Sequence, residues 1–197
     1  KRVMNRLQKQ IEFITEIDKL KHILRQSVLI DDRRRENDAE HSWHLAVMTM
    51  LLSEYVKEEI DLLRVMKMVL IHDIVEIDAG DTFAYDETGY EDKDEREKQA
   101  AERIFNILPA DQAEKMNDLW LEFEAKETPE ARYAASLDRL QPLLLNYNSE
   151  GHTWKKPGVN SEKVYKRMAV IKESTPEIWD YVVEIIEDSI NKGYLKR

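Results

Sequence analysis

Apolar residues recur at intervals of three and four through most of this chain, which is the repeat of an amphipathic helix. Only five glycines and five prolines interrupt that pattern in 197 residues. Strands therefore have little room, and we expect an all-α fold. At this length, with 42% hydrophobic residues, the chain can bury one sizeable core. We expect a single domain over 1–197, with its core at about 15–170 and a C-terminal helix, 176–192, packed on it.

Helix boundaries follow from the same periodicity and from capping residues. A first helix is expected from Val3 to Leu24, and a second from about Asp38, capped by Asn37 or Asp38 itself, to about Lys57. The segment at about 61–77 is apolar on nearly every side, as in a helix buried at the centre of a bundle. A polar loop of about fifteen residues should follow at 81–95. Later helices are expected at about 96–108, from 111, from 129 after the cap Thr128, at about 164–171 and at 176–192.

Charge and cysteine content exclude several classes of function. The formal net charge is −10, so we expect no general affinity for nucleic acid. The absence of cysteine excludes disulfides, thiolate nucleophiles and Cys-ligated zinc, and suits a cytoplasmic enzyme. No apolar run approaches the ~20 residues of a membrane helix, so no membrane association is expected.

Four clusters place polar, metal-competent side chains inside apolar helices, where unpartnered polar groups cost several kcal/mol. They are Glu40–His44, His72–Glu76, Gly80–Thr82 and Asp138. Any one histidine alone would be interpreted as a core residue, but the clusters occur together. Two imidazoles with two carboxylates balance the charge of a dication and suit Mn²⁺, Fe²⁺, Co²⁺ or Zn²⁺ better than Ca²⁺. Four protein ligands leave positions for water and a phosphate oxygen.

These segments resemble the ordered signature of the HD superfamily. The matching stretches are Ala39–His44, Ile71–Glu76, Gly80-Asp81 and Ser136–Leu140, with further likeness at Asn146-Tyr147 and Glu150–Trp154. The likeness is greatest to the small 5′-deoxynucleotidases, both the bacterial enzymes and the eukaryotic HD-domain-containing protein 2. It covers roughly residues 15–170, and it implies a helical bundle of the HD type with long loops near a metal site.

The resemblance implies a role for each matching residue. His41, His72, Asp73 and Asp138 match the family's ligands to one divalent metal ion. The carboxylate of Asp138 should therefore lie within a solvent molecule's width of His72 and Asp73.

The resemblance also supplies residues for the reaction itself. Glu76 and Asp81 match the acidic residues that activate the attacking water and assist the leaving oxygen. Arg25 matches an arginine that contacts the substrate's sugar and phosphate. Gln26 departs from the bacterial pattern, which has tryptophan there, so the resemblance does not carry sugar discrimination to this chain.

Three other features each allow two interpretations. Glu40 either orients a ligand imidazole or favours the helix N-terminus. His44 either extends the site or is a structural polar residue that faces a neighbouring helix. The run 33–35 of three arginines either attracts phosphate or is a solvated loop.

The function expected from these observations is a metal-dependent phosphomonoesterase acting on nucleoside, above all deoxynucleoside, 5′-monophosphates. One alternative is a pyrophosphohydrolase acting on triphosphates or the guanosine alarmone. The alarmone hydrolases carry a Glu-Asp pair where this chain has Glu76-Ile77, which weakens that alternative. Another is a non-catalytic metal-binding scaffold, against which the presence of both Glu76 and Asp81 argues. By analogy with relatives, we expect a homodimer.

Overall fold

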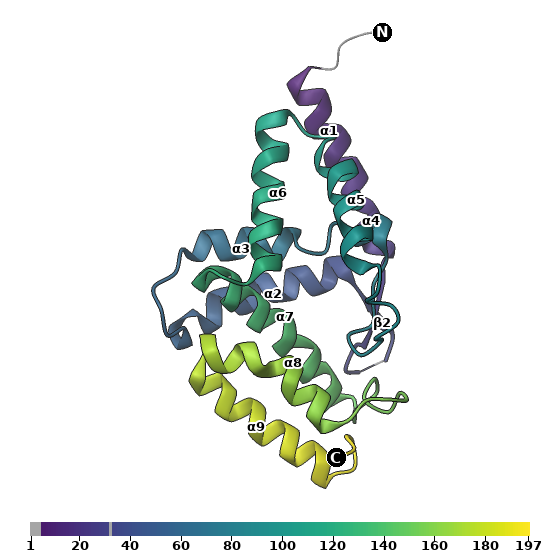
Figure 1. The fold of residues 1–197 in the computed structure, drawn as a ribbon, viewed down its shortest axis with the longest axis vertical. Coiled ribbons are helices and arrows are strands. Elements are labelled where there is room, and N and C mark those ends of the chain that lie inside the picture. The colour runs from purple at the N-terminus through teal and green to yellow at the C-terminus, as the bar shows by residue number, and fades with distance from the viewer. Residues whose placement is uncertain (1–4, 32) are drawn as a thin grey trace.

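The computed structural model describes residues 5–31 and 33–197 and is mostly helical, which confirms the expected all-α class (Figure 1). Its elements in chain order are α1 Arg6–Glu16, η1 Ile17–His22, β1 Leu24–Val28, β2 Arg35–Asn37, α2 Asp38–Leu52, η2 Ser53–Tyr55, α3 Leu62–Ile71, α4 Glu76–Ala79, α5 Lys93–Phe105, α6 Ala110–Ala125, α7 Pro129–Asn148, α8 Ser161–Ser174 and α9 Pro176–Asn191. None of the described helices is long and apolar enough to cross a membrane.

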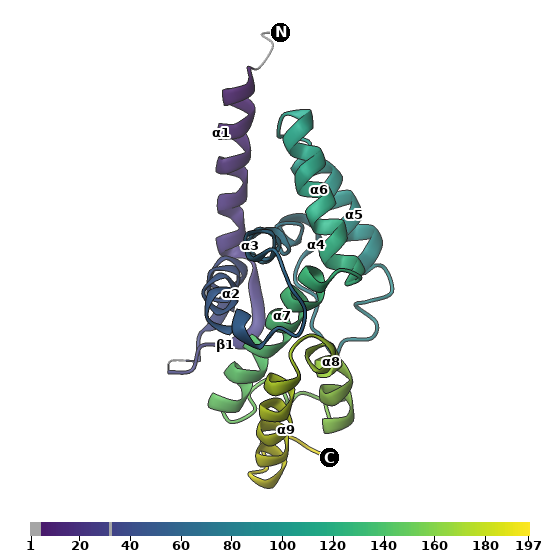
Figure 2. The same ribbon diagram turned by 90° about the vertical axis from the view of Figure 1, so that its left-hand side faces the viewer.

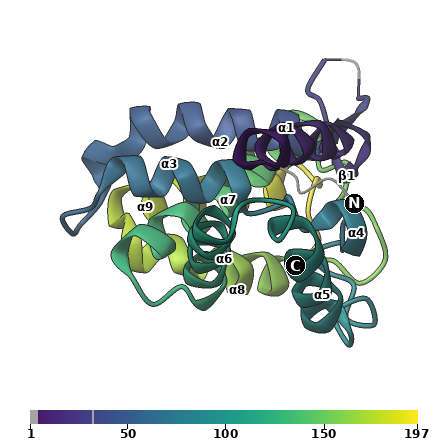
Figure 3. The same ribbon diagram turned by 90° about the horizontal axis from the view of Figure 1, so that it is seen from above.

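Helix α7 is central to the bundle and packs against α2, α3, α6, α8 and α9. Helices α2 and α3 lie side by side across the middle of the molecule, as Figures 1 and 3 both show. Helices α8 and α9 cover one end, and α1, α5 and α6 extend from the other (Figure 2).

Buried apolar side chains form two clusters, and each gathers residues from distant parts of the chain. The first gathers residues of α2, α3, α7, α8 and α9, such as Leu45, Met68 and Ile186. The second gathers residues of α1, α4, α5 and α6, such as Phe13 and Ile104. The chain passes from the first cluster to the second at the end of α3, so residues at that point lie between the two.

Capping explains where the best-predicted helices begin. Asn37 caps α2, and Glu40 completes the capping box by accepting the backbone N–H of Asn37 at 3.0 Å. Glu40 also pairs with Arg34 at 2.8 Å, so it stabilises the helix start and does not orient an imidazole. Thr128 caps α7 as predicted, with Pro129 in its first turn.

The predicted first helix is too long. Helix α1 ends at Glu16, a 3-10 turn follows, and the chain then pairs as strand β1 with β2 in an antiparallel register of Leu24 with Asn37. Pairing with β2 satisfies backbone groups that a helix would otherwise have bonded internally. Val3 lies outside the described residues.

The predicted helix over 61–77 is interrupted at the site. Helix α3 ends at Ile71, and 72–75 form tight turns in which the N–H of Ile74 donates to the carbonyl of Ile71 at 3.1 Å. The Glu76 N–H donates in the same way to the Asp73 carbonyl at 2.9 Å. The prediction of one uninterrupted helix over this segment is therefore wrong.

Other boundaries differ by a few residues. Helix α5 begins at Lys93 and α8 spans Ser161–Ser174, both earlier than predicted. Gly80 ends α4 with φ +77°, a conformation that favours glycine, and starts the loop that carries Asp81.

Candidate functional site

The structure brings the four predicted metal ligands together from three parts of the chain. His41 lies on α2, His72 and Asp73 follow α3, and Asp138 lies on α7. Oδ1 of Asp138 is 3.0 Å from Nε2 of His41 and 3.3 Å from Nε2 of His72. The sequence requires Asp138 to lie near His72 and Asp73; it lies 3.3 Å from His72, which in turn lies 3.1 Å from Asp73.

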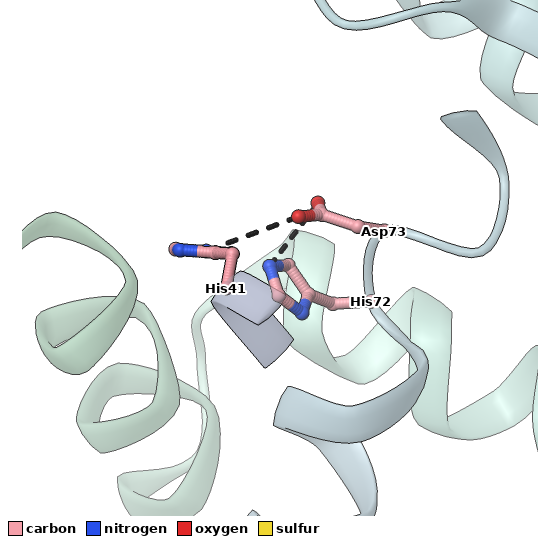
Figure 4. Close-up of side chains that lie close together, drawn as sticks. All are labelled: His41, His72 and Asp73. Atoms are coloured by element: carbon pink, nitrogen blue, oxygen red, sulfur yellow. Dashed lines mark ion pairs between the residues drawn. The ribbon is translucent and has the colours of Figure 1, made fainter. Parts of the chain in front are cut away.

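Asp73 contacts both imidazoles (Figure 4). Its Oδ1 lies 3.1 Å from Nε2 of His72, and its Oδ2 lies 3.8 Å from Nε2 of His41. Both histidines and Asp73 are buried. His41, His72 and Asp73 thus offer ligand atoms close enough to one another to hold a metal ion.

The hydrogen-bond network sets the tautomer of His72. Its Nδ1 lies 2.8 Å from the carbonyl oxygen of Val69, which can only accept, so Nδ1 carries the hydrogen. Nε2 then presents a lone pair toward the carboxylates of Asp73 and Asp138. Within the described residues this buried nitrogen has no hydrogen-bond partner.

Gln141 sets the tautomer of His41 in the same way. The Gln141 amide donates from Nε2 to Glu36 at 2.6 Å, which leaves its Oε1 to accept from Nδ1 of His41 at 2.9 Å. His41 therefore also presents the lone pair of Nε2 to Asp138. His44 lies 3.2 Å from Gln141 through Nδ1, so it contacts this network and not the ligand cluster.

Two imidazole lone pairs that face two carboxylates require a cation between them. The pKa of His72 indicates the same attraction of the site for positive charge. Burial alone lowers it, yet Asp73 and Asp138 raise it well above the usual range, so a proton is strongly held where no metal is bound. The donor set of nitrogen and carboxylate oxygen fits a divalent cation, and these His and Asp side chains are positioned to bind one.

Arg25, predicted to contact substrate, lies beside the cluster on β1. Its Nη1 donates to Asp73 at 2.8 Å and to Asp38 at 3.2 Å, and its side chain is 12% exposed. The guanidinium therefore compensates two buried carboxylates while it also lines the cleft above them. Gln26, the neighbouring residue, accepts a hydrogen bond from Lys156.

A cleft of about 460 Å³ opens over the cluster, and Glu76 and Asp81 both line it. One oxygen of each carboxylate, Oε2 of Glu76 and Oδ2 of Asp81, is buried without a hydrogen-bond partner in the described part of the chain. Glu76 also forms a second acidic group with Asp38 and Asp73 that could hold a cation. The predicted acids thus lie where a reacting molecule would meet them.

The sequence interpretation missed Asp38, Glu36 and Gln141 as parts of this site. Gln141 had a signal, because it follows Asp138 by three residues and so shares its helix face. Asp38 was noted only as a possible cap, yet it is fully buried beside Arg25. Nothing in the local pattern marked Glu36, which reaches the site through the strand pairing.

Side chains of the arginine run 33–35 form hydrogen bonds with other parts of the chain. Arg33 donates to the backbone carbonyl of Ser149 at 3.1 Å, and Arg35 donates to the carbonyls of Arg25 and Leu24. These arginines are exposed, as the interpretation as a solvated loop expects, and their hydrogen bonds also stabilise the hairpin and its neighbours.

The chain is similar to known proteins over most of its length. The family model described as "HD domain" matches residues 17–179. A crystal structure of a predicted metal-dependent phosphohydrolase from Magnetospirillum magnetotacticum is 53% identical, with a TM-score of 0.93, over 98% of this chain and 96% of that one.

Two curated relatives carry the name 5′-deoxynucleotidase HDDC2. The Bos taurus protein is 27% identical over 89% of this chain and 83% of its own length. The Homo sapiens protein is 28% identical over 68% of this chain, and the match spans 65% of its length, just under two thirds. The expected resemblance to this branch of hydrolases is confirmed. The chain belongs to the HD domain family.

Proposed function

We propose that this chain hydrolyses nucleoside 5′-monophosphates, deoxynucleotides above all, to nucleoside and phosphate with the aid of one divalent transition metal ion. The observation that carries the proposal is the pair of imidazole lone pairs and carboxylates beneath an open cleft, with two further unpaired carboxyl oxygens nearby. The relatives named 5′-deoxynucleotidase support the substrate class.

His41, His72, Asp73 and Asp138 are the proposed ligands. Mn²⁺, Co²⁺, Fe²⁺ and Zn²⁺ all suit this donor set. Such an ion supplies two effects when bound: it lowers the pKa of water and draws negative charge from a phosphoryl group.

Glu76 is the proposed acceptor of the proton from the attacking water. Its carboxylate is buried, and Oε2 has no partner among the described residues. Burial and the nearby Asp73 and Asp38 raise the pKa of Glu76 well above its usual range, so its carboxylate, once ionised, is a stronger base than an exposed one.

Asp81 is the proposed proton donor to the departing nucleoside oxygen. Burial, with a contribution from Asp73, raises the pKa of Asp81, which favours the protonated form that this role requires. Asp81→Ala should reduce turnover by about 10²- to 10⁴-fold and leave the metal content unchanged. Loss of metal from that variant would contradict the division of roles.

Arg25 is proposed to face the sugar and phosphate of the substrate while it remains paired with Asp73. Arg25→Lys keeps the charge but removes the planar fork of the guanidinium. The KM should therefore rise by a larger factor than the factor by which the metal affinity falls. An unchanged KM with reduced metal affinity would instead limit Arg25 to the support of Asp73.

A product assay tests the proposed reaction as a whole. The protein is incubated with Mn²⁺ or Co²⁺ and matched panels of deoxy- and ribonucleoside monophosphates, triphosphates and cyclic dinucleotides. Release of inorganic phosphate from monophosphates is the expected result. Pyrophosphate or tripolyphosphate from triphosphates would indicate the alternative hydrolase, and no product would indicate a scaffold.

Assembly as a homodimer, in the cytoplasm, completes the proposal. Large apolar side chains lie exposed on the first three helices: Leu7, Ile11, Ile14, Trp43, Met50, Leu51, Leu63 and Leu70. Exposed apolar surface of this kind favours association. Light scattering after size exclusion should give twice the chain mass of 23.3 kDa, and Leu51→Glu should reduce it. A monomer at micromolar concentration would refute this.

A further inference from the structure

Three cationic side chains from separate helices meet at the rim of the metal cleft. Lys126 ends α6, Arg139 lies on α7 and Arg167 lies on α8. All three line the cleft over the cluster and also an adjoining cavity of about 590 Å³. They therefore form the boundary between the two spaces, and we call them the cationic wall.

The charges of the cationic wall are poorly compensated by the protein. Arg167 makes no hydrogen bond or ion pair within the part of the chain that the structure describes. The ammonium of Lys126 donates to a backbone carbonyl, that of Glu124, at 3.1 Å. Arg139 alone has a carboxylate partner, Oδ2 of Asp138 at 3.1 Å, and that carboxylate also faces the two histidines.

Mutual repulsion within the wall supports this description. Lys126, Arg139 and Arg167 line the same two spaces, so their positive charges repel one another. Although the chain has a net charge of −10, these three cations are held together, and their repulsion costs electrostatic free energy. An anion bound between them would offset that cost.

Other residues that line the cleft carry the opposite charge. Asp73, Glu76 and Asp81 line it, and the two proposed carboxylate ligands already offset the charge of a dication. A phosphate ester carries negative charge of its own and would be repelled by these acids. The cationic wall supplies the compensating positive charge. The ion pair between Arg139 and Asp138 joins the wall to the metal cluster.

We propose that Lys126, Arg139 and Arg167 bind the phosphate group of the substrate and hold it against the metal cluster, an inference that rests on the proposed function. Guanidinium groups suit this task because their planar fork pairs with two phosphate oxygens at once. Arg139 and Arg167 are thus substrate-binding residues, in addition to Arg25.

Arg167→Gln is the variant of choice because the native side chain holds no other residue in place. Its matched control is Lys166→Gln, which removes the same charge from the next position on α8, outside the metal cleft. The probe is inorganic phosphate, titrated by calorimetry into the folded protein at fixed ionic strength, both metal-free and loaded with Mn²⁺.

Arg167→Gln should weaken phosphate binding by about 10- to 100-fold, the loss typical of a hydrogen bond to a charged group. Its KM for monophosphates should rise, while Mn²⁺ affinity and melting temperature stay at the wild-type values. Lys166→Gln should change phosphate binding by less than about 3-fold, because Lys166 is exposed and lines the adjoining cavity but not the metal cleft, so its charge is screened. Arg139→Lys, which keeps the charge, should give an intermediate loss.

Two results would overturn the inference: no phosphate binding by the wild-type protein, or equal binding by Arg167→Gln and the wild type. Either can occur while monophosphates are still hydrolysed, which leaves the proposed function standing. Conversely, wild-type protein that binds phosphate through Arg167 but releases none from any monophosphate would refute the function and not the phosphate site.

Discussion

Gln141 offers a direct way to disturb the cluster without touching a proposed ligand. The amide is fully buried and joins two groups, with its oxygen 2.9 Å from Nδ1 of His41 and its nitrogen 2.6 Å from Oε1 of Glu36. Gln141→Leu keeps a similar volume but removes both hydrogen bonds. The N–H of His41 and the carboxyl oxygen of Glu36 would then be buried with no partner from residue 141.

The magnitude follows from those two orphaned groups. Each buried polar group left unpaired costs about 1–3 kcal/mol, so the free energy of unfolding should fall by about 2–6 kcal/mol. Loss of the group that orients a ligand imidazole typically lowers metal affinity by about 10- to 100-fold, or about 1.4–2.7 kcal/mol. Gln141→Leu should therefore lower both stability and the affinity for Mn²⁺.

The assay combines urea denaturation of the metal-free protein with calorimetric titration of Mn²⁺. Tyr133→Phe is the control. Tyr133 lies on α7, as Gln141 does, and its buried hydroxyl donates to the Thr49 carbonyl at 3.0 Å, away from the cluster. That variant should lose about 1 kcal/mol of stability and retain full metal affinity. Unchanged Mn²⁺ affinity in Gln141→Leu would refute the assignment of Gln141 as the residue that orients His41.

Three further predictions concern stability. Removing metal with a chelator should lower the melting temperature, since an ion at 100 times its Kd adds about 2.7 kcal/mol to the folded state; an unchanged melting temperature would argue against a bound ion. Gly151 and Gly158 both have positive φ, but a Cβ at Gly151 would lie 2.2 Å from the Tyr194 carbonyl oxygen, whereas none of the described atoms lies within 4 Å at Gly158. Gly158→Ala should therefore lower the free energy of unfolding by about 1 kcal/mol, and Gly151→Ala by at least about 2 kcal/mol more. Urea denaturation measures both losses, and equal losses would contradict this prediction. Arg103→Ala removes ion pairs with Asp78 and Glu16, but Arg103 is about half exposed, so thermal unfolding should report a loss below about 1 kcal/mol, and a larger one would contradict this estimate.

The fold was largely predictable because periodicity and caps act locally. Helix α7 begins after Thr128 as expected, since its cap and first-turn proline are adjacent in sequence. The β1 and β2 pair was not predictable in this way. Its register depends on residues 24 and 37 meeting, and the apolar spacing up to Leu24 fits a helix equally well.

In the candidate site, too, the residues were predictable from local sequence, but their geometry was not. His41, His72, Asp73 and Asp138 stood out because each is a polar group in an apolar helix. Their geometry depends on a feature that the pattern hides, the turns after Ile71 that interrupt α3. Those turns let two consecutive side chains, His72 and Asp73, face one point.

The supporting residues required tertiary structure. Glu36, Lys126 and Arg167 come from β2, the end of α6 and α8, and each lies in a polar stretch where a charged residue attracts no notice. Lys126 and Arg167 differ from solvated charges only in that they line the cleft, and Glu36 only in that it lies 3.7 Å from Arg25.

A crystal structure of the protein soaked in Mn²⁺, with anomalous diffraction data, tests the central claim most directly. We predict an anomalous peak coordinated by Nε2 of His41, Nε2 of His72 and the carboxylates of Asp73 and Asp138. No peak among these four side chains at saturating Mn²⁺, or a peak held only by Asp38 and Glu76, would contradict the proposed metal site and the reaction built on it.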